Sequence, residues 1–211
     1  YGLTETCGAG TILEPNDHDP ALGKLRSCGK VAPTAELKIV NSSGDTLGPN
    51  EVGEITYRSK SVMKGYWQNS EATEKSISSG WFSTGDAGYL DEEGYLYIHD
   101  RIKDMIVSGG ENVYPAEVEN ALFDHPAIGD VAVIGVPDEK WGEAVKAVVV
   151  LKPGSTVSEE EIIAHSRTKI AGYKIPKSVD FAEVLPRNPT GKLLKRELRK
   201  PYWEGKDRQI N

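Results

Sequence analysis

The chain has 211 residues, of which 38% are hydrophobic and 27% charged, and its formal net charge at pH 7 is −7. These values describe an ordinary globular protein of one or two domains, and the negative charge gives no electrostatic reason to expect binding to nucleic acid or to a membrane surface. No apolar run approaches membrane-spanning length, and Cys7 and Cys28 are too few for a disulfide framework. The four histidines are scattered and show no zinc-binding spacing. Because the cysteines are so few, we expect a reducing, cytoplasmic location.

The first half of the chain, from about residue 20 to residue 100, is expected to be rich in β-structure. Strands are predicted at residues 36–40, 53–58, 86–90 and 95–100. The turn sequence NSSG follows the first of these strands, and DEEG at residues 91–94 is a good hairpin loop between the last two. A short helix is predicted over residues 71–75, with Ser70 as its N-cap.

After Arg101 strands and helices alternate, which predicts a compact α/β unit. Strands are predicted at residues 105–107, 113–114, 131–136, 145–151 and 179–184, and the third and fourth are apolar enough to be buried on both faces. Helices are predicted at residues 115–123, after a capping box at residues 158–161, and at residues 193–199. Pro115 suits the first turn of the first of these helices, and the last helix is basic.

Five short motifs punctuate this pattern in a fixed order. They are YGLTE at residues 1–5, STGD at 83–86, DRIKD at 100–104, SGGEN at 108–112 and PRNPTGKL at 186–193. Their order and wording resemble the adenylate-forming enzymes, which include acyl-CoA synthetases, peptide-synthetase adenylation domains and firefly luciferases. Residues 100–115 look most like those of long- or medium-chain fatty-acid–CoA ligases, since peptide-synthetase domains usually carry an Arg-Gly-Phe-Arg-like run where SGGE stands here.

The resemblance covers the chain from Tyr1 to about Arg199 and implies its domain organisation. Residues 1–101 would be the β-rich, barrel-like end of a large AMP-binding N-terminal domain, and residues 102–211 a compact, mobile α/β lid domain. The family begins several hundred residues earlier, with a phosphate-binding loop that does not occur here. We therefore expect the C-terminal part of a longer enzyme, inactive without its N-terminal portion, with exposed apolar surface on residues 1–100 that another copy of the chain could cover.

The reaction implied by the resemblance joins a small-molecule carboxylic acid, expected to be a fatty acid, to ATP. Acyl-AMP and pyrophosphate form first, and the thiol of coenzyme A then displaces AMP. ATP/AMP, Mg²⁺ and coenzyme A are therefore the implied cofactors. Both half-reactions develop negative charge on oxygen atoms, so positioned cations and hydrogen-bond donors should supply most of the catalysis.

The YGLTE motif is expected to meet the nucleotide. By resemblance, Tyr1 and Gly2 border the adenine, Thr4 contacts the α-phosphate, and Glu5 helps to hold Mg²⁺, a cation that prefers oxygen ligands. Taken alone, this pentapeptide would equally fit a strand-end turn with a solvated glutamate. The other motifs favour the functional interpretation.

The central motifs carry the next three candidates. A carboxylate such as that of Asp86 accepts two hydrogen bonds at once, which suits the two hydroxyls of ribose, although an aspartate capping a turn is common. Arg101 is placed by resemblance near the ribose and phosphates, and its alternative is a surface salt bridge. Lys103 occupies the family's hinge position, where a backbone rotation must be absorbed.

Two glycines and a tryptophan are candidates for the coenzyme A side. Gly109 and Gly110 permit close backbone approach, and by resemblance their loop lines the pantetheine tunnel, although a plain hairpin turn explains them as well. Trp141 offers a flat surface suited to the adenine of coenzyme A, or is an ordinary core residue. Lys174 and Lys177 could meet the phosphates of coenzyme A.

Lys192 is the main catalytic candidate. An ammonium on a long stem, presented by a loop that contains glycine, can reach both the substrate carboxylate and the α-phosphate. The resemblance implies that it stabilises the adenylation transition state and then leaves as the lid rotates. The neighbouring Lys195, Arg196, Arg199 and Lys200 are interpreted as a solvated helix face.

Three alternatives remain open at this point. The chain could belong to a peptide-synthetase adenylation domain, whose thiol acceptor is a carrier protein. Luciferase-type oxygenation uses the same scaffold, although no residue here demands it. A non-catalytic partner fragment is the third alternative, from a different functional class.

Overall fold

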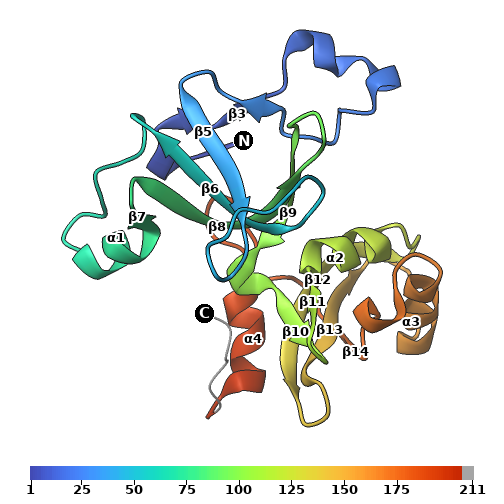
Figure 1. Cartoon of the computed structure of the whole chain (residues 1–211). Helices are drawn as coiled ribbons and strands as arrows, with labels where there is room; N and C mark the ends of the chain where they lie inside the picture. Colours follow the sequence, from blue (N-terminus) through green and yellow to red (C-terminus); the bar gives the residue numbers. More distant parts are fainter. Residues whose placement is uncertain (206–211) are drawn as a thin grey trace. The chain divides into compact units, whose positions relative to one another are not determined.

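Residues 1–205 are described by a computed structural model, apart from the side chain of Ala9. The chain divides into two units, the first from Tyr1 to Ile102 and the second from Lys103 onward (Figure 1). Strands dominate the first unit, and strands and helices share the second, which confirms the predicted mixed α/β fold. Over the same residues, no helix is both long enough and apolar enough to cross a membrane.

The first unit is built on an antiparallel sheet around the long strand β8. Its strands are β5 (Ala35–Val40), β6 (Gly53–Ser59), β7 (Ile77–Ser78), β8 (Trp81–Leu90) and β9 (Leu96–Arg101). β6 pairs along one edge of β8, while β7 and β9 share the other edge. Register shifts in the β6–β8 and β8–β9 pairs increase the local twist, and the sheet curls into a half-barrel. The four strands predicted in this half are confirmed.

Short elements complete the first unit. They are the strand pair β1 (Gly2–Leu3) and β2 (Gly8–Ala9), the pair β3 (Thr11–Ile12) and β4 (Lys30–Val31), and the 3₁₀ turns η1 (Thr4–Thr6), η2 (Pro15–His18) and η3 (Pro20–Leu22). Ile39, Ile55 and Leu96, from three strands of the sheet, form one buried apolar cluster. The core of this unit is therefore small.

Helix α1 (Ser70–Ser76) corrects one prediction. Its N-cap is Asn69, whose side-chain oxygen accepts a hydrogen bond from the backbone N–H of Ala72 at 3.0 Å, and not Ser70. Asparagine and serine cap helices about equally well. The two residues are adjacent, so the choice between them depends on where the preceding loop ends.

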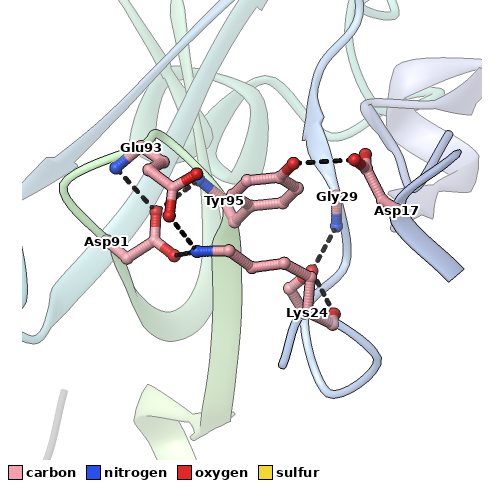
Figure 2. A network of polar contacts seen from close by, with 7 residues as sticks. Asp17, Lys24, Gly29, Asp91, Glu93 and Tyr95 are labelled. Atoms are coloured by element: carbon pink, nitrogen blue, oxygen red, sulfur yellow. Dashed lines mark hydrogen bonds and ion pairs between the residues drawn. The ribbon is translucent and has the colours of Figure 1, made fainter. Parts of the chain in front are cut away.

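A network of polar contacts joins the loop between β3 and β4 to the turn between β8 and β9 (Figure 2). Lys24 Nζ lies 2.8 Å from an oxygen of Asp91 and 2.6 Å from one of Glu93. The other Asp91 oxygen accepts hydrogen bonds from the backbone N–H groups of Glu93 and Tyr95, and the Tyr95 hydroxyl donates to Asp17 at 2.8 Å. Polar contacts thus hold a loop in which Leu22 and Leu25 are exposed.

The second unit is a five-stranded sheet with helices on both faces. The 3₁₀ turn η4 (Ile102–Asp104) spans the boundary between the two units. The elements that follow it are β10 (Ile106–Ser108), β11 (Glu111–Val113), α2 (Pro115–Phe123), β12 (Ile128–Asp138), β13 (Gly142–Leu151), α3 (Glu159–Arg167), η5 (Gly172–Lys174), β14 (Ser178–Phe181) and α4 (Lys195–Trp203). The order is β11-β10-β13-β12, with β14 parallel to β13. As predicted, Pro115 opens α2 and Ser158 caps α3 in a capping box.

Alternate residues of β12 point to two different cores. Val131 and Val133 join the cluster under α2 and α3, whereas Ala132 and Ile134 join the cluster under α4. Figure 1 shows α4 on one side of this sheet and α2 with α3 on the other. Burial of both faces explains the continuous apolar runs in β12 and β13, and confirms that prediction.

Two predicted elements near the C-terminal end have different bounds. β14 ends at Phe181, and Val184 beyond it is exposed. Helix α4 begins at Lys195, not at residue 193, because Leu193 pairs with Arg187 and the Leu194 N–H donates to the Pro186 carbonyl. Residues 193 and 194 are therefore held in an extended hairpin that a helix would break.

Candidate active site

Asp86 is the centre of a polar cluster in the first unit. It lies opposite Arg101 in the antiparallel register of β8 and β9, with Arg101 Nε 3.4 Å from Asp86 Oδ1. The Tyr1 hydroxyl donates to Asp86 Oδ2 at 2.8 Å. The Thr84 hydroxyl, two residues earlier in β8, accepts a hydrogen bond from the backbone N–H of Asp86. A mostly buried carboxylate is thus held by one hydrogen bond, from Tyr1, and one ion pair, with Arg101.

Tyr1 acts in this cluster as a neutral donor. Burial raises the pKa of the Tyr1 hydroxyl well above its ordinary value, and its hydrogen bond to the Asp86 carboxylate raises the pKa further. The proton therefore stays on the Tyr1 hydroxyl at neutral pH. Such a cluster can hold a ligand that offers hydroxyl groups.

Thr4 and Glu5 lie in the 3₁₀ turn that follows β1. Thr4 is exposed, while Glu5 is half-buried and accepts a hydrogen bond on Oε1 from the Tyr66 hydroxyl at 3.1 Å. The Glu5 carbonyl accepts from the Met63 N–H, so two segments fix this turn. Among residues 1–205, no group of three His, Cys, Asp or Glu side chains could hold a metal ion by itself. A single carboxylate fits Mg²⁺ that is bound mainly through nucleotide phosphates and water.

Gly109, Gly110 and Trp141 come together where the β10–β11 turn meets the β12–β13 turn. The Gly109 N–H donates to the Trp141 carbonyl at 2.8 Å, and both glycines have positive φ, 62° and 86°. A Cβ on Gly109 would lie 2.7 Å from Trp141 Cε3, so the indole requires glycine there. Trp141 is 39% exposed, and the ammonium groups of Lys140 and Lys177 lie 4.6 and 5.8 Å from its ring centre. The turn offers an aromatic surface beside two cations.

Lys174 is engaged within the second unit. Its ammonium lies 2.6 Å from both carboxylate oxygens of Glu117 in α2. Burial alone would lower the pKa of Lys174, but the hydrogen bond to Glu117 outweighs it and raises the pKa. Lys174 therefore joins η5 to α2, and Lys177 is the more accessible cation beside Trp141.

Lys192 lies on a tight turn between residues 187 and 193. The Asn188 side-chain oxygen accepts from the backbone N–H groups of Thr190 and Lys192 at 3.1 and 2.8 Å, and Gly191 adopts φ = 84°. The side chain of Lys192 is exposed, and its ammonium forms no ion pair within the part of the chain that the structure describes. Lys103 is also exposed and lies in η4.

Two basic residues of α4 contradict the prediction of a solvated helix face. Lys195 Nζ lies 2.8 Å from Glu119 in α2, and Arg199 Nη1 lies 2.7 Å from Asp104, with all four side chains less than 20% exposed. Only Arg196 and Lys200 point to solvent as expected. The two side chains are paired because α4 packs on the sheet, where it meets Glu119 and Asp104, two acidic residues distant in sequence.

Sequence reasoning missed the residues that hold the candidates in place. Nothing in the sequence indicated that Tyr66 would meet Glu5, 61 residues away. Arg187 had a local signal, since it lies in the PRNPTGKL motif and its guanidinium donates to the carbonyl of Gly191, just before Lys192. Of the predicted site residues, the structure brings Tyr1, Asp86 and Arg101 together in the first unit, and Gly109, Gly110 and Trp141 together in the second.

Comparisons with known proteins agree with the sequence motifs. A family model described as "AMP-binding enzyme" matches residues 1–67, and one described as "AMP-binding enzyme C-terminal domain" matches residues 117–192. The chain is 48% identical over 202 residues to the long-chain-fatty-acid–CoA ligase FadD13 of Mycobacterium tuberculosis, which covers 96% of this chain and 39% of that protein. It is 42% identical over 211 residues to the fatty acid–[acyl-carrier-protein] ligase ScoC of Streptomyces coeruleorubidus, covering 100% of this chain and 41% of ScoC.

A solved structure gives the same picture. The o-succinylbenzoate CoA synthetase MenE of Bacillus subtilis, in complex with the acyl-adenylate intermediate OSB-AMP, matches with a TM-score of 0.86 and 43% identity. The match covers 94% of this chain and 40% of that one. The same synthetase in complex with ATP and magnesium ion matches with a TM-score of 0.84 and 42% identity over the same shares. The chain thus spans about two fifths of the length of these relatives.

Proposed function

Because this chain belongs to the AMP-binding, adenylate-forming enzyme family, we propose that it supplies the C-terminal part of an ATP-dependent acid–thiol ligase. The enzyme would activate a carboxylic acid as acyl-AMP, release pyrophosphate, and transfer the acyl group to coenzyme A. Residues 1–101 would complete the AMP-binding domain, and residues 102–211 would form a lid domain that turns about Lys103 between the half-reactions. The location would be cytoplasmic.

The observation that carries the proposal is the exposed Lys192 ammonium on a fixed turn. In the same region Lys195 and Arg199 are paired with carboxylates, so their charge is already used within the fold. The charge of Lys192 is still available to a ligand. An ammonium there would neutralise the charge that develops on the acid carboxylate and the α-phosphate as the acyl–phosphate bond forms.

The first unit would hold the nucleotide. Asp86 would accept hydrogen bonds from the ribose hydroxyls, and Arg101 would meet ribose and phosphate oxygens. Thr4 would donate to the α-phosphate, with Tyr1 and Gly2 beside the adenine. The half-buried carboxylate of Glu5 would help to hold Mg²⁺, which when bound would offset the negative charge of the phosphates.

The second unit would serve thioester formation by a different surface. Gly109 and Gly110 lack side chains, so pantetheine could pass close to their backbone. Trp141 would stack on the adenine of coenzyme A, and Lys177 beside it would attract the phosphates. Because Trp141 and Gly109 are hydrogen-bonded to each other, this surface would act as one piece.

We further propose a fatty acid as the substrate, on the strength of residues 100–115 and of the 48% identity to FadD13. Transfer to a carrier protein is the second candidate, because ScoC is named as a fatty acid–[acyl-carrier-protein] ligase and matches the whole chain. The two candidates share adenylation and differ only in the thiol acceptor.

A chimera tests the proposal. This chain would replace the matching segment of FadD13, and acid-dependent exchange of pyrophosphate into ATP would be measured with palmitate, ferulate and o-succinylbenzoate. We expect exchange with palmitate, and product formation with coenzyme A rather than with acyl-carrier protein. A folded chimera that supports no exchange with any acid would contradict the proposal. Exchange by the 211-residue chain alone would contradict the need for the remaining length.

A further inference from the structure

We propose that Arg187 is a positioning residue, whose guanidinium orients the Lys192 turn on the sheet of the second unit. Nη2 of Arg187 lies 2.7 Å from Asp130 Oδ2, and Nη1 donates to the Gly191 carbonyl at 2.9 Å. One planar group therefore bridges β12 and the peptide that directly precedes Lys192. The catalytic meaning of this bridge rests on the proposed function, whereas its effect on the turn does not.

The position of Asp130 is set by a bulge in β12. Ile128 pairs with Leu151 and Asp130 with Val150, so Gly129 is an extra residue in this strand. Bulges re-aim the side chains beside them. Asp130 Oδ1 accepts from the backbone N–H of Val131, which is buried in the core, and Oδ2 is then turned to Arg187. The core of the sheet thus fixes one end of the bridge.

Asn188 shapes the turn, but it does not attach the turn to the sheet. Its side-chain oxygen accepts from Thr190 and Lys192, all within five residues. Arg187 adds a contact to a strand 57 residues away in sequence. Asn188 therefore closes the turn, and Arg187 orients it on the sheet.

The bridge is built for orientation rather than for stability. The side chains of Arg187 and Asp130 are 44% and 34% exposed, and ion pairs at such exposure stabilise a fold weakly. Arginine is required because its rigid fork donates in two directions, which a lysine ammonium on a flexible stem does not reproduce. We therefore expect loss of Arg187 to free the turn while leaving the fold intact.

The first test uses nuclear magnetic resonance on the 211-residue chain. Backbone order parameters at Gly191 and Lys192 should be about 0.85 in the original chain and below about 0.6 in Arg187→Ala. Arg187→Lys should fall between them, and Asp130→Asn should reproduce Arg187→Ala. The matched control is Arg196→Ala, which removes an exposed guanidinium from the neighbouring helix. Unchanged order in both Arg187→Ala and Asp130→Asn would overturn the proposal.

The second test uses the FadD13 chimera. Arg187→Ala should slow acyl-AMP formation at least about tenfold, a change of about 1.4 kcal/mol in activation free energy, with little change in the KM for ATP. In a Lys192→Ala background, Arg187→Ala should slow the reaction no further. If Arg187 acts only by orienting the Lys192 ammonium, its loss has no effect once that ammonium has been removed. If the double variant were slowed by the product of the two single-variant factors, Arg187 would act independently of Lys192, and the positioning role would be overturned. An inactive parent chimera would count against the proposed function alone, because the order parameters do not depend on turnover.

Discussion

The Asp86 cluster and the Lys192 turn use charge in opposite ways. Asp86 is buried and held by the Tyr1 hydroxyl and Arg101, so its geometry exists before any ligand arrives. Lys192 is exposed, and the structure fixes its backbone while leaving its ammonium without an ion pair among residues 1–205. An acceptor for neutral hydroxyls can be built in advance, whereas a cation that must meet developing charge has to stay unneutralised.

Replacing Lys192 should have the largest effect on activity. In the FadD13 chimera, Lys192→Ala should slow acyl-AMP formation by about 10²–10³-fold, the usual effect of losing one group that stabilises developing charge. Thioester formation from supplied acyl-AMP should be spared. Separate single-turnover assays of the two half-reactions measure this difference.

Lys200→Ala is the matched control for Lys192, because Lys200 is an exposed lysine in the adjoining helix. It should leave both half-reactions unchanged. If Lys192→Ala slowed both half-reactions equally, the ammonium would not be specific to adenylation, and the contrast between the two regions would fail.

Replacing Arg199 tests whether a paired basic residue of α4 stabilises the second unit. Its ion pair with Asp104 is 12% and 14% exposed, so Arg199→Ala leaves a largely buried carboxylate without its partner. We expect the unfolding free energy of the second unit to fall by on the order of 2–3 kcal/mol. Amide hydrogen exchange in β12 and β13 measures this quantity. Arg196→Ala, on the exposed face of the same helix, should change it by less than about 0.5 kcal/mol, and equal losses would contradict the assignment.

Asp86→Asn should weaken nucleotide binding without unfolding the first unit. The amide keeps the shape of the side chain but loses the charge that strengthens its hydrogen bonds, so affinity for AMP should fall by about tenfold to a hundredfold. Calorimetric titration of the chimera with AMP measures the loss. Glu92→Gln, an exposed carboxylate in the β8–β9 loop, is the control and should bind AMP normally. Unchanged affinity in Asp86→Asn would place the ribose elsewhere.

Local signals predicted much of the fold, and non-local contacts account for what was missed. Pro115 and the capping box at Ser158 fixed the starts of two helices, because those signals act within four residues. The pairing of Lys195 with Glu119 joins elements 76 residues apart, and no local pattern distinguishes such a lysine from a solvated one. Likewise, the motifs named Asp86 and Arg101 as candidates, but only the strand register places them side by side.

The smallest expected effect concerns Asp180, which joins β14 to α4. The pH dependence of the unfolding free energy tests how much its charged contacts contribute. Burial alone would raise the pKa of the Asp180 carboxyl, but hydrogen bonds from Lys146 and Tyr202 outweigh it and lower the pKa below its ordinary value. A lowered folded-state pKa gives stability that is present above about pH 4 and is lost as the pH falls through that lowered value. Asp180 is 42% exposed, so screening limits the contribution to less than about 1 kcal/mol.

Urea unfolding of the 211-residue chain and of Asp180→Asn, followed between pH 7 and pH 2.5, measures the effect of Asp180. The difference in unfolding free energy should be largest near neutral pH and should shrink toward zero at the acid end, because protonation then removes the same charge that the substitution removes. Tyr202→Phe keeps the ring that packs on the sheet and should leave most of this pH dependence in place, since Lys146 still holds the carboxylate. A difference that stays constant across the range would mean that Asp180 acts through packing, and paired charge would then explain less of how α4 is held.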